Sequence, residues 1–157
     1  MAKVQVIMML TIDGFLPPAN DNLVQWIKTN KKGFMHWRKK GTVSLFPHYP
    51  LIDLILDKKK EDNPCIYFAE ITNRDSLELF HGLSIYRLVD EIVLYRLPIN
   101  REEGNDFPVD LPLKEWKVKK IKTYRNGICR TIYHKTTDQT LKQMFQNHSI
   151  LYFSNNL

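Results

Sequence analysis

The sequence predicts one α/β domain whose sheet is mostly parallel and ends in an antiparallel hairpin. Three apolar runs, at 3–12, 64–69 and 90–97, have the length and composition of buried strands. Amphipathic segments with helical spacing separate these runs, an order that is typical of parallel sheets. Two further β-rich runs flank Asn126 and Gly127, a dipeptide that favours a hairpin turn.

The composition sets the class of protein. The chain has 157 residues, of which 43% are hydrophobic and 25% are charged, as in an ordinary globular domain. No run has the length of uncharged residues that a membrane span requires, so we expect no membrane partner. Cys65 and Cys129 are too few for a disulfide framework, and the apolar N-terminus lacks a signal-peptide cleavage site. Both observations favour a cytoplasmic protein.

The first half of the chain alternates strand and helix. The strand over 3–12 ends at an Asp-Gly turn, and Asp21 or Asn22 can cap a helix over 23–29. The segment 31–49 follows no clear pattern. The next proline suits the first turn of a helix. Apolar residues at helical spacing follow it and predict a helix that ends at a run of three lysines.

The second half repeats this order and then closes with the hairpin. After the strand over 64–69, Thr72 or Asn73 can cap a helix that we expect to stop near Gly82. The strand over 90–97 is ended by a proline, which cannot donate to a ladder. Hairpin strands follow at 116–124 and 128–135. They predict a type I′ turn, in which both central residues have a positive φ.

The net charge of +6 and the pI near 9.3 attract anionic partners. The positive charges stand in short clusters rather than along one helix, and such clusters are common on ordinary surfaces. The basic and aromatic residues Phe34, Trp37 and 38–40 leave a nucleic-acid-binding module as a less favoured alternative. Small phosphorylated ligands would be attracted by the same potential.

Three short motifs resemble the dihydrofolate reductase-like superfamily. "LTIDGFL" ends the first strand, "LVDEIVLYRLPI" covers 88–99, and "TYRNGICRTIYHK" covers 123–135. Their order and spacing are similar to those of the reductase domain of the riboflavin-biosynthesis deaminase/reductase and of its stand-alone bacterial homologues. The resemblance implies a dihydrofolate reductase-like three-layer fold over 1–135, in a shortened form, with a C-terminal helix or tail at 136–157.

The resemblance also implies an activity, namely NADPH-dependent reduction of a pteridine-like or ribosylamino-pyrimidine substrate. Asp13, at the carboxyl end of the first strand, would be the catalytic residue, binding an amino-pyrimidine or orienting a water. The residues alone support another interpretation equally well, in which Asp13 accepts backbone N–H bonds in its turn. The resemblance implies NADPH binding by Thr11, Thr42, Thr72, Asn73 and Ser76.

Two departures from the family pattern keep a second function open. The strand at 64–69 is followed by Glu70 rather than by a Gly-Gly pair, and Glu70 and Asp75 would oppose a pyrophosphate. The family's Gly-Arg-x-Thr motif is reduced to Gly41-Thr42. The alternative is therefore a degenerate homologue without cofactor or activity, acting as a dimeric binding or scaffold protein. In either case we expect a homodimer.

The other conspicuous residues predict no additional chemistry. The five histidines have no partner at metal spacing, so we expect no metal site. Asp90 and Glu91 are expected to pair with Arg87 or with a lysine. Aromatic residues of the segment 31–49, Trp37 among them, could form the floor of a pocket for a flat heterocycle.

Overall fold

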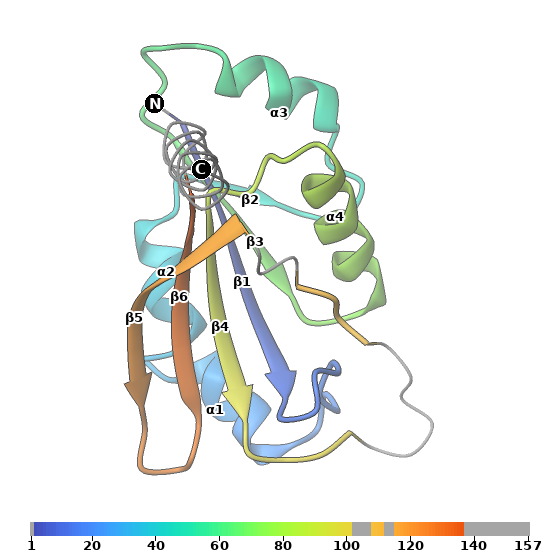
Figure 1. Ribbon diagram of the computed structural model, residues 1–157, viewed down its shortest axis with the longest axis vertical. Helices are drawn as coiled ribbons and strands as arrows, with labels where there is room; N and C mark the ends of the chain where they lie inside the picture. The colour runs from blue at the N-terminus through green and yellow to red at the C-terminus, as the bar shows by residue number, and fades with distance from the viewer. Residues whose placement is uncertain (1, 102–107, 112–114, 137–157) are drawn as a thin grey trace, which may run out of the picture.

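Six strands form one sheet in the order β2-β3-β1-β4-β6-β5 (Figure 1). The computed structural model describes residues 2–101, 108–111 and 115–136. Strands β2, β3, β1 and β4 are parallel, whereas β6 runs antiparallel to β4 and β5 antiparallel to β6. The predicted α/β class, a mostly parallel sheet with an antiparallel C-terminal hairpin, is confirmed. The strands are β1 Lys3–Thr11, β2 Val43–Leu45, β3 Ile66–Ile71, β4 Glu91–Leu97, β5 Trp116–Thr123 and β6 Cys129–Lys135.

Helices cover both faces of the sheet and make three layers (Figure 1). Even-numbered residues of β1, such as Val6 and Met8, pack in one core with side chains of α3 and α4. The odd-numbered Ile7 and Met9 pack in a second core with side chains of α1 and α2. Because successive side chains of a strand point to opposite faces of the sheet, the central strand β1 contributes side chains to both cores. The helices are α1 Asn22–Thr29, α2 Phe34–Lys40, α3 Leu51–Lys58 and α4 Arg74–Ile85.

Local signals account for most element boundaries. Asp21 caps α1, because its carboxylate accepts a hydrogen bond from the backbone N–H of Leu23 at 2.8 Å. Asn73 caps α4 in the same manner, and α3 begins directly after Pro50. The segment 31–49, which had no clear pattern, contains α2 and β2.

Two local predictions were wrong. Helix α4 does not stop near Gly82 but continues to Ile85, with Gly82 inside it and close to a leucine side chain of α3. The hairpin turn is not type I′, because Gly127 has a φ of 90° whereas Asn126 has no positive φ. The N–H of Gly127 instead bonds the carbonyl of Tyr124, which makes a three-residue loop with glycine at its end.

The described residues contain no helix that is long and apolar enough to cross a membrane. Cys65 and Cys129 are free and half-buried. Except for Thr136, the predicted C-terminal helix or tail lies outside the described residues.

Candidate functional site

Asp13 stands in a turn at the carboxyl end of β1. The hydroxyl of Thr11 donates to Asp13 Oδ1 at 2.6 Å and accepts from the N–H of Phe15 at 3.0 Å. The backbone N–H of Arg101 lies 3.1 and 3.3 Å from the two carboxylate oxygens. Asp13 therefore ties the segment after β4 to the turn after β1, a structural role that uses a distant backbone donor, whereas the sequence suggested donors of its own turn.

The carboxylate of Asp13 is exposed and remains available to a ligand. Its pKa lies below the ordinary value for Asp, chiefly because of the hydrogen bond from Thr11; burial acts in the opposite direction, and the backbone N–H of Arg101 lowers the pKa further. Asp13 is accordingly ionised at neutral pH. It is suited to accept hydrogen bonds rather than to donate a proton.

Thr72, Asn73 and Ser76 lie together where β3 ends and α4 begins. Asn73 Oδ1 accepts from the N–H of Ser76 at 2.9 Å, and Ser76 Oγ accepts from the N–H groups of Thr72 and Asn73 at 2.9 and 3.0 Å. These contacts form a capping box. Three of the five predicted cofactor residues are thus brought together, and they also satisfy one another.

The same three residues line a cavity of about 440 Å³ that also includes Arg38 and Ser44. Arg38 reaches it from α2 and makes a bidentate ion pair with Glu70, in which Nη2 lies 2.8 Å from Oε2 and Nε contacts Oε1. Arg38 thereby neutralises the acid that the sequence led us to expect opposite a phosphate. We call this cavity the β3 cavity.

Thr11 and Thr42 do not line the β3 cavity with the other predicted cofactor residues. Thr11 is fully buried, and its hydroxyl serves the Asp13 turn. Thr42 precedes β2, and its N–H and hydroxyl bond the carbonyl and N–H of Ile66, the first residue of β3. The β3 cavity extends along the strands, where Phe68 and Glu70 of β3 and Ser44 of β2 line it, so Thr42 lies two residues from a lining residue without lining the cavity itself.

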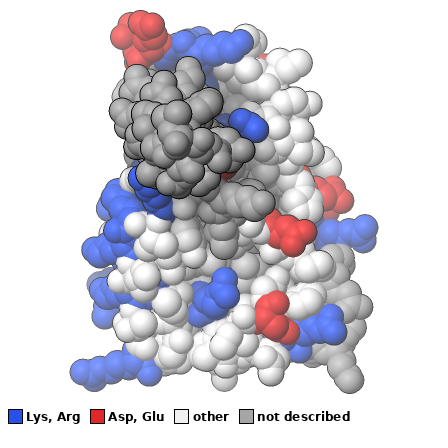
Figure 2. Space-filling model, in the orientation of Figure 1, with Lys and Arg blue, Asp and Glu red and all other residues white. Residues whose placement is uncertain are grey.

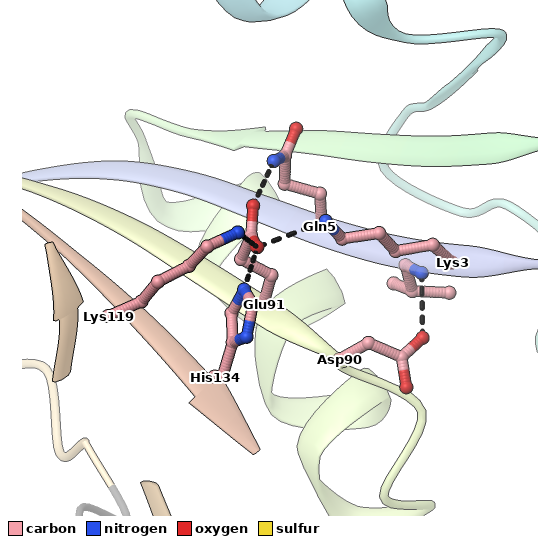
Figure 3. Close-up of polar contacts among 7 residues, drawn as sticks. Lys3, Gln5, Asp90, Glu91, Lys119 and His134 are labelled. Carbon is pink, nitrogen blue, oxygen red and sulfur yellow. Dashed lines mark hydrogen bonds and ion pairs between the residues drawn. The ribbon is translucent and has the colours of Figure 1, made fainter. Parts of the chain in front are cut away.

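A second polar cluster surrounds Glu91 at the beginning of β4 (Figure 3). Its buried carboxylate accepts from Lys3 at 3.0 Å and from Gln5 at 2.5 Å, and it contacts His134. Burial raises the pKa of Glu91, but the hydrogen bonds from Lys3 and Gln5 and the nearby positive charge outweigh it, so that the net pKa is lowered.

The pairing of the acidic motif with lysines is confirmed on both residues. Asp90 accepts from the backbone N–H of Val4 and pairs with Lys58, each at 2.8 Å, while Glu91 pairs with Lys3. The contact of Glu91 with His134 was missed. These two residues face each other across the antiparallel β4–β6 pair, and that register cannot be read from the spacing along the chain.

Next to Glu91 lies a cavity of about 540 Å³, which we call the basic cavity. Among the described residues that line it, one residue is acidic, Glu91, and eight are basic. Trp37, His36 and Tyr124 add aromatic surface. Figure 2 shows Lys and Arg gathered along the edge of the molecule where β5 lies. The basic residues are Lys3, Lys31, Lys32, Lys40, Lys119, Lys120, Lys122 and Arg130.

Sequence reasoning identified Trp37 as a possible pocket residue but not the basic cavity itself. The cavity combines side chains from the segment before α2, from α2 itself and from strands β1, β3, β4, β5 and β6. The one signal in the sequence is the lysine-rich pattern of β5, which is exposed along nearly its whole length. Within the described part of the chain, no group of histidines, cysteines and carboxylates could hold a metal ion.

Comparisons with known proteins give a distant structural likeness. No family model matches the chain, and no curated protein matches it. Among solved structures, the chain is similar to a crystal structure from Shewanella sp. PV-4 that is provisionally described as a riboflavin biosynthesis protein. The match has a TM-score of 0.49 and 15% identity and covers 86% of this chain and 99% of that one. A likeness at this level carries no conclusion about activity.

Proposed function

We propose that the chain is an NADPH-dependent reductase of a small heterocyclic substrate of the pteridine or ribosylamino-pyrimidine type. The observation that carries the proposal is the β3 cavity, which Thr72, Asn73 and Ser76 line together. The carboxyl ends of parallel strands are the usual place for nucleotide ligands in open α/β sheets. Position and residue type therefore agree with the expectation that came from the sequence motifs.

The donors around the β3 cavity fit the phosphate part of such a cofactor. Helix α4 has 12 residues, and its N-terminus provides a favourable environment for negative charge. Arg38 supplies a guanidinium group and Ser44 a hydroxyl. Because Glu70 is already paired with Arg38, its charge opposes a phosphate less than the sequence alone suggests.

NADPH would supply a hydride, while the protein would supply position and charge. Asp13 lies at the same edge of the sheet as the β3 cavity, beyond the end of the neighbouring strand β1. Because Thr11 and Arg101 stabilise its ionised form, Asp13 is suited to accept a hydrogen bond from the amino group of a pteridine or pyrimidine ring. We assign it to substrate binding rather than to proton donation.

Calorimetric titration with NADPH tests this proposal. We expect saturable, micromolar binding by the wild type and a loss of roughly tenfold in Arg38→Gln, because a charge-assisted hydrogen-bond donor is removed. Lys39→Gln is the matched control, since the adjacent residue of α2 lines neither cavity. Absence of binding at millimolar NADPH, or equal weakening in both variants, would contradict the proposal.

A second candidate function is the degenerate homologue, a homodimeric binding or scaffold protein without cofactor. The capping box favours it, because the N–H groups of Thr72 and Asn73 already bond Ser76 and are not free to receive a phosphate. This candidate predicts no heat with NADPH together with a dimer in light scattering, whereas a monomer would count against it.

A further inference from the structure

The face of the sheet that carries α1 and α2 changes character along each central strand. On β1 the residues facing these helices change from Lys3 and Gln5 to Ile7 and Met9, and on β4 from Glu91 to the buried Val93. The apolar residues form the core with α1 and α2. The polar residues Lys3, Gln5 and Glu91 line the basic cavity. The two strands therefore border a cavity at their amino ends and are covered by α1 and α2 at their carboxyl ends.

The positive charge of the basic cavity is not balanced within the described part of the chain. Glu91 is its acid, and its carboxylate is already engaged by Lys3, Gln5 and His134. Of the β5 lysines that line the cavity, Lys119 lies 3.9 Å from Glu91, whereas Lys120 and Lys122 have no ion pair with a described residue. Like charges that converge on one cavity repel one another unless an anion enters.

Arg130 is the most informative of these residues because it is buried. Only 8% of its surface is exposed, yet its Nε has no hydrogen-bond partner among the described residues. Its Nη1 donates to the hydroxyl of Tyr124 at 3.3 Å, and no described carboxylate pairs with it. A buried guanidinium with an unused donor is costly, and an anion in the cavity would supply both the charge and the acceptor.

Trp37 lines the cavity beside Arg130, and a hydrogen bond fixes the orientation of its indole ring. Its indole N–H donates to the hydroxyl of Tyr95 at 2.9 Å, and the guanidinium of Arg130 lies 5.8 Å from its ring centre. The neighbouring His36 has a pKa below the ordinary value, first because of burial and then because of the positive charges of Lys40 and Arg130. The cavity is thus a preformed site of positive potential with an aromatic wall.

We propose that the basic cavity binds a small phosphorylated ligand with two or more phosphate groups, such as a nucleotide or an inorganic polyphosphate. Arg130 would bind one phosphate at the base of the cavity, and Lys120 and Lys122 would bind the rest from β5. A volume of about 540 Å³ is in the range of small-molecule pockets. The concave shape favours a compact ligand over an extended nucleic acid strand.

This inference does not depend on the reductase proposal. Among the described residues, the basic cavity and the β3 cavity share no lining residue. NADPH also carries phosphates, so its site at the β3 cavity is the one that persists in saturating triphosphate and depends on Arg38, whereas binding of a polyphosphate depends on Arg130 and the lysines of β5. If one of the two proposals fails, the other can still be tested on its own residues.

The test is calorimetric titration of the full chain with inorganic triphosphate, ATP and adenosine. We expect micromolar, saturable binding of triphosphate and ATP, no binding of adenosine, and a change in Trp37 fluorescence on saturation. The double variant Lys120→Gln/Lys122→Gln changes exposed side chains, so it should fold, and it should lose roughly tenfold or more in affinity. Arg130→Lys retains the charge but loses the planar donors and should also weaken binding.

A control variant of equal net charge separates a site from a general charge effect. Lys39→Gln/Lys59→Gln removes two exposed lysines that do not line the basic cavity and should bind triphosphate within about twofold of the wild type. Equal losses in the two double variants would overturn the proposal, as would absence of saturable triphosphate binding. Affinity for single-stranded oligonucleotides that rises with their length and exceeds that for triphosphate would also overturn it, in favour of nucleic acid.

Discussion

The β3 cavity and the basic cavity lie on either side of α2 and differ in how their polar groups are satisfied. At the β3 cavity, Thr72, Asn73 and Ser76 bond one another, and Arg38 is paired with Glu70. At the basic cavity, cations gather around one carboxylate, and the buried Arg130 retains an unused donor. Groups that satisfy one another stabilise the fold, whereas groups left unsatisfied indicate a ligand. The basic cavity therefore carries the stronger structural argument for binding.

The largest expected effect concerns Glu91, the counter-charge of the basic cavity. Glu91→Gln should lower the free energy of unfolding by about 3 kcal/mol, because Lys3 and Lys119 then repel one another without an acid and His134 loses its carboxylate partner. The same change should tighten triphosphate binding, since the cavity becomes more positive. Urea unfolding and calorimetry measure the two effects. A variant that is destabilised and also binds triphosphate less tightly would contradict the proposed site.

Gly41 tests whether α2 couples the two cavities. A Cβ at this position would lie 2.1 Å from Cδ1 of Phe68, so Gly41→Ala must displace the end of α2 or the ring. We expect a loss of about 2 kcal/mol in unfolding free energy. Because α2 carries Arg38 toward one cavity and Trp37 toward the other, both NADPH and triphosphate binding should weaken. An effect on only one ligand would show that the cavities do not share this helix as a support.

A substitution of Asn73 distinguishes a structural role of this residue, as the cap of α4, from a role in ligand binding. Asn73→Ala removes the side-chain cap of α4 and should cost about 1 kcal/mol of stability. On the reductase proposal NADPH binding weakens as well, because a donor of the cavity is lost. Unchanged NADPH affinity in the folded variant would assign Asn73 to the helix cap alone. Asp21→Ala, at the cap of α1, is the matched control, with a similar loss of stability and unchanged binding.

The smallest expected effects are those of pH. The pKa of Glu91 is lowered in the folded state, so its contribution to stability is complete above the ordinary pKa of a glutamate. This contribution is lost as the pH falls through the lower, folded-state value. Urea unfolding measured across the acidic range should show that loss in the wild type and not in Glu91→Gln. Equal slopes in both proteins would contradict the assignment.

Local chemistry made much of the fold predictable. The helix caps at Asp21 and Asn73, the apolar strands and the hairpin each depend on a few neighbouring residues. The segment 31–49 could not be predicted, because short elements such as α2 and β2 owe their stability to packing against the sheet rather than to pattern. The turn type was wrong because an Asn-Gly dipeptide also suits a three-residue loop with a single positive φ.

The candidate sites also differ in how far the sequence could predict them. Thr72, Asn73 and Ser76 are neighbours in the chain, so the sequence could group them, whereas Thr42 was assigned to them and lies at the other end of β3. The basic cavity draws on residues from Lys3 to Ile132. Its contacts depend on strand order and register, which no local pattern specifies.

One competition experiment tests the central claim that the two cavities are separate binding sites. NADPH is titrated into the protein in the presence and absence of saturating inorganic triphosphate. The account predicts that both ligands bind. NADPH carries phosphates and can also enter the basic cavity, so the account predicts that one saturable NADPH site, weakened in Arg38→Gln, remains when triphosphate occupies that cavity. Complete displacement of NADPH by triphosphate, or absence of binding by either ligand, would contradict it.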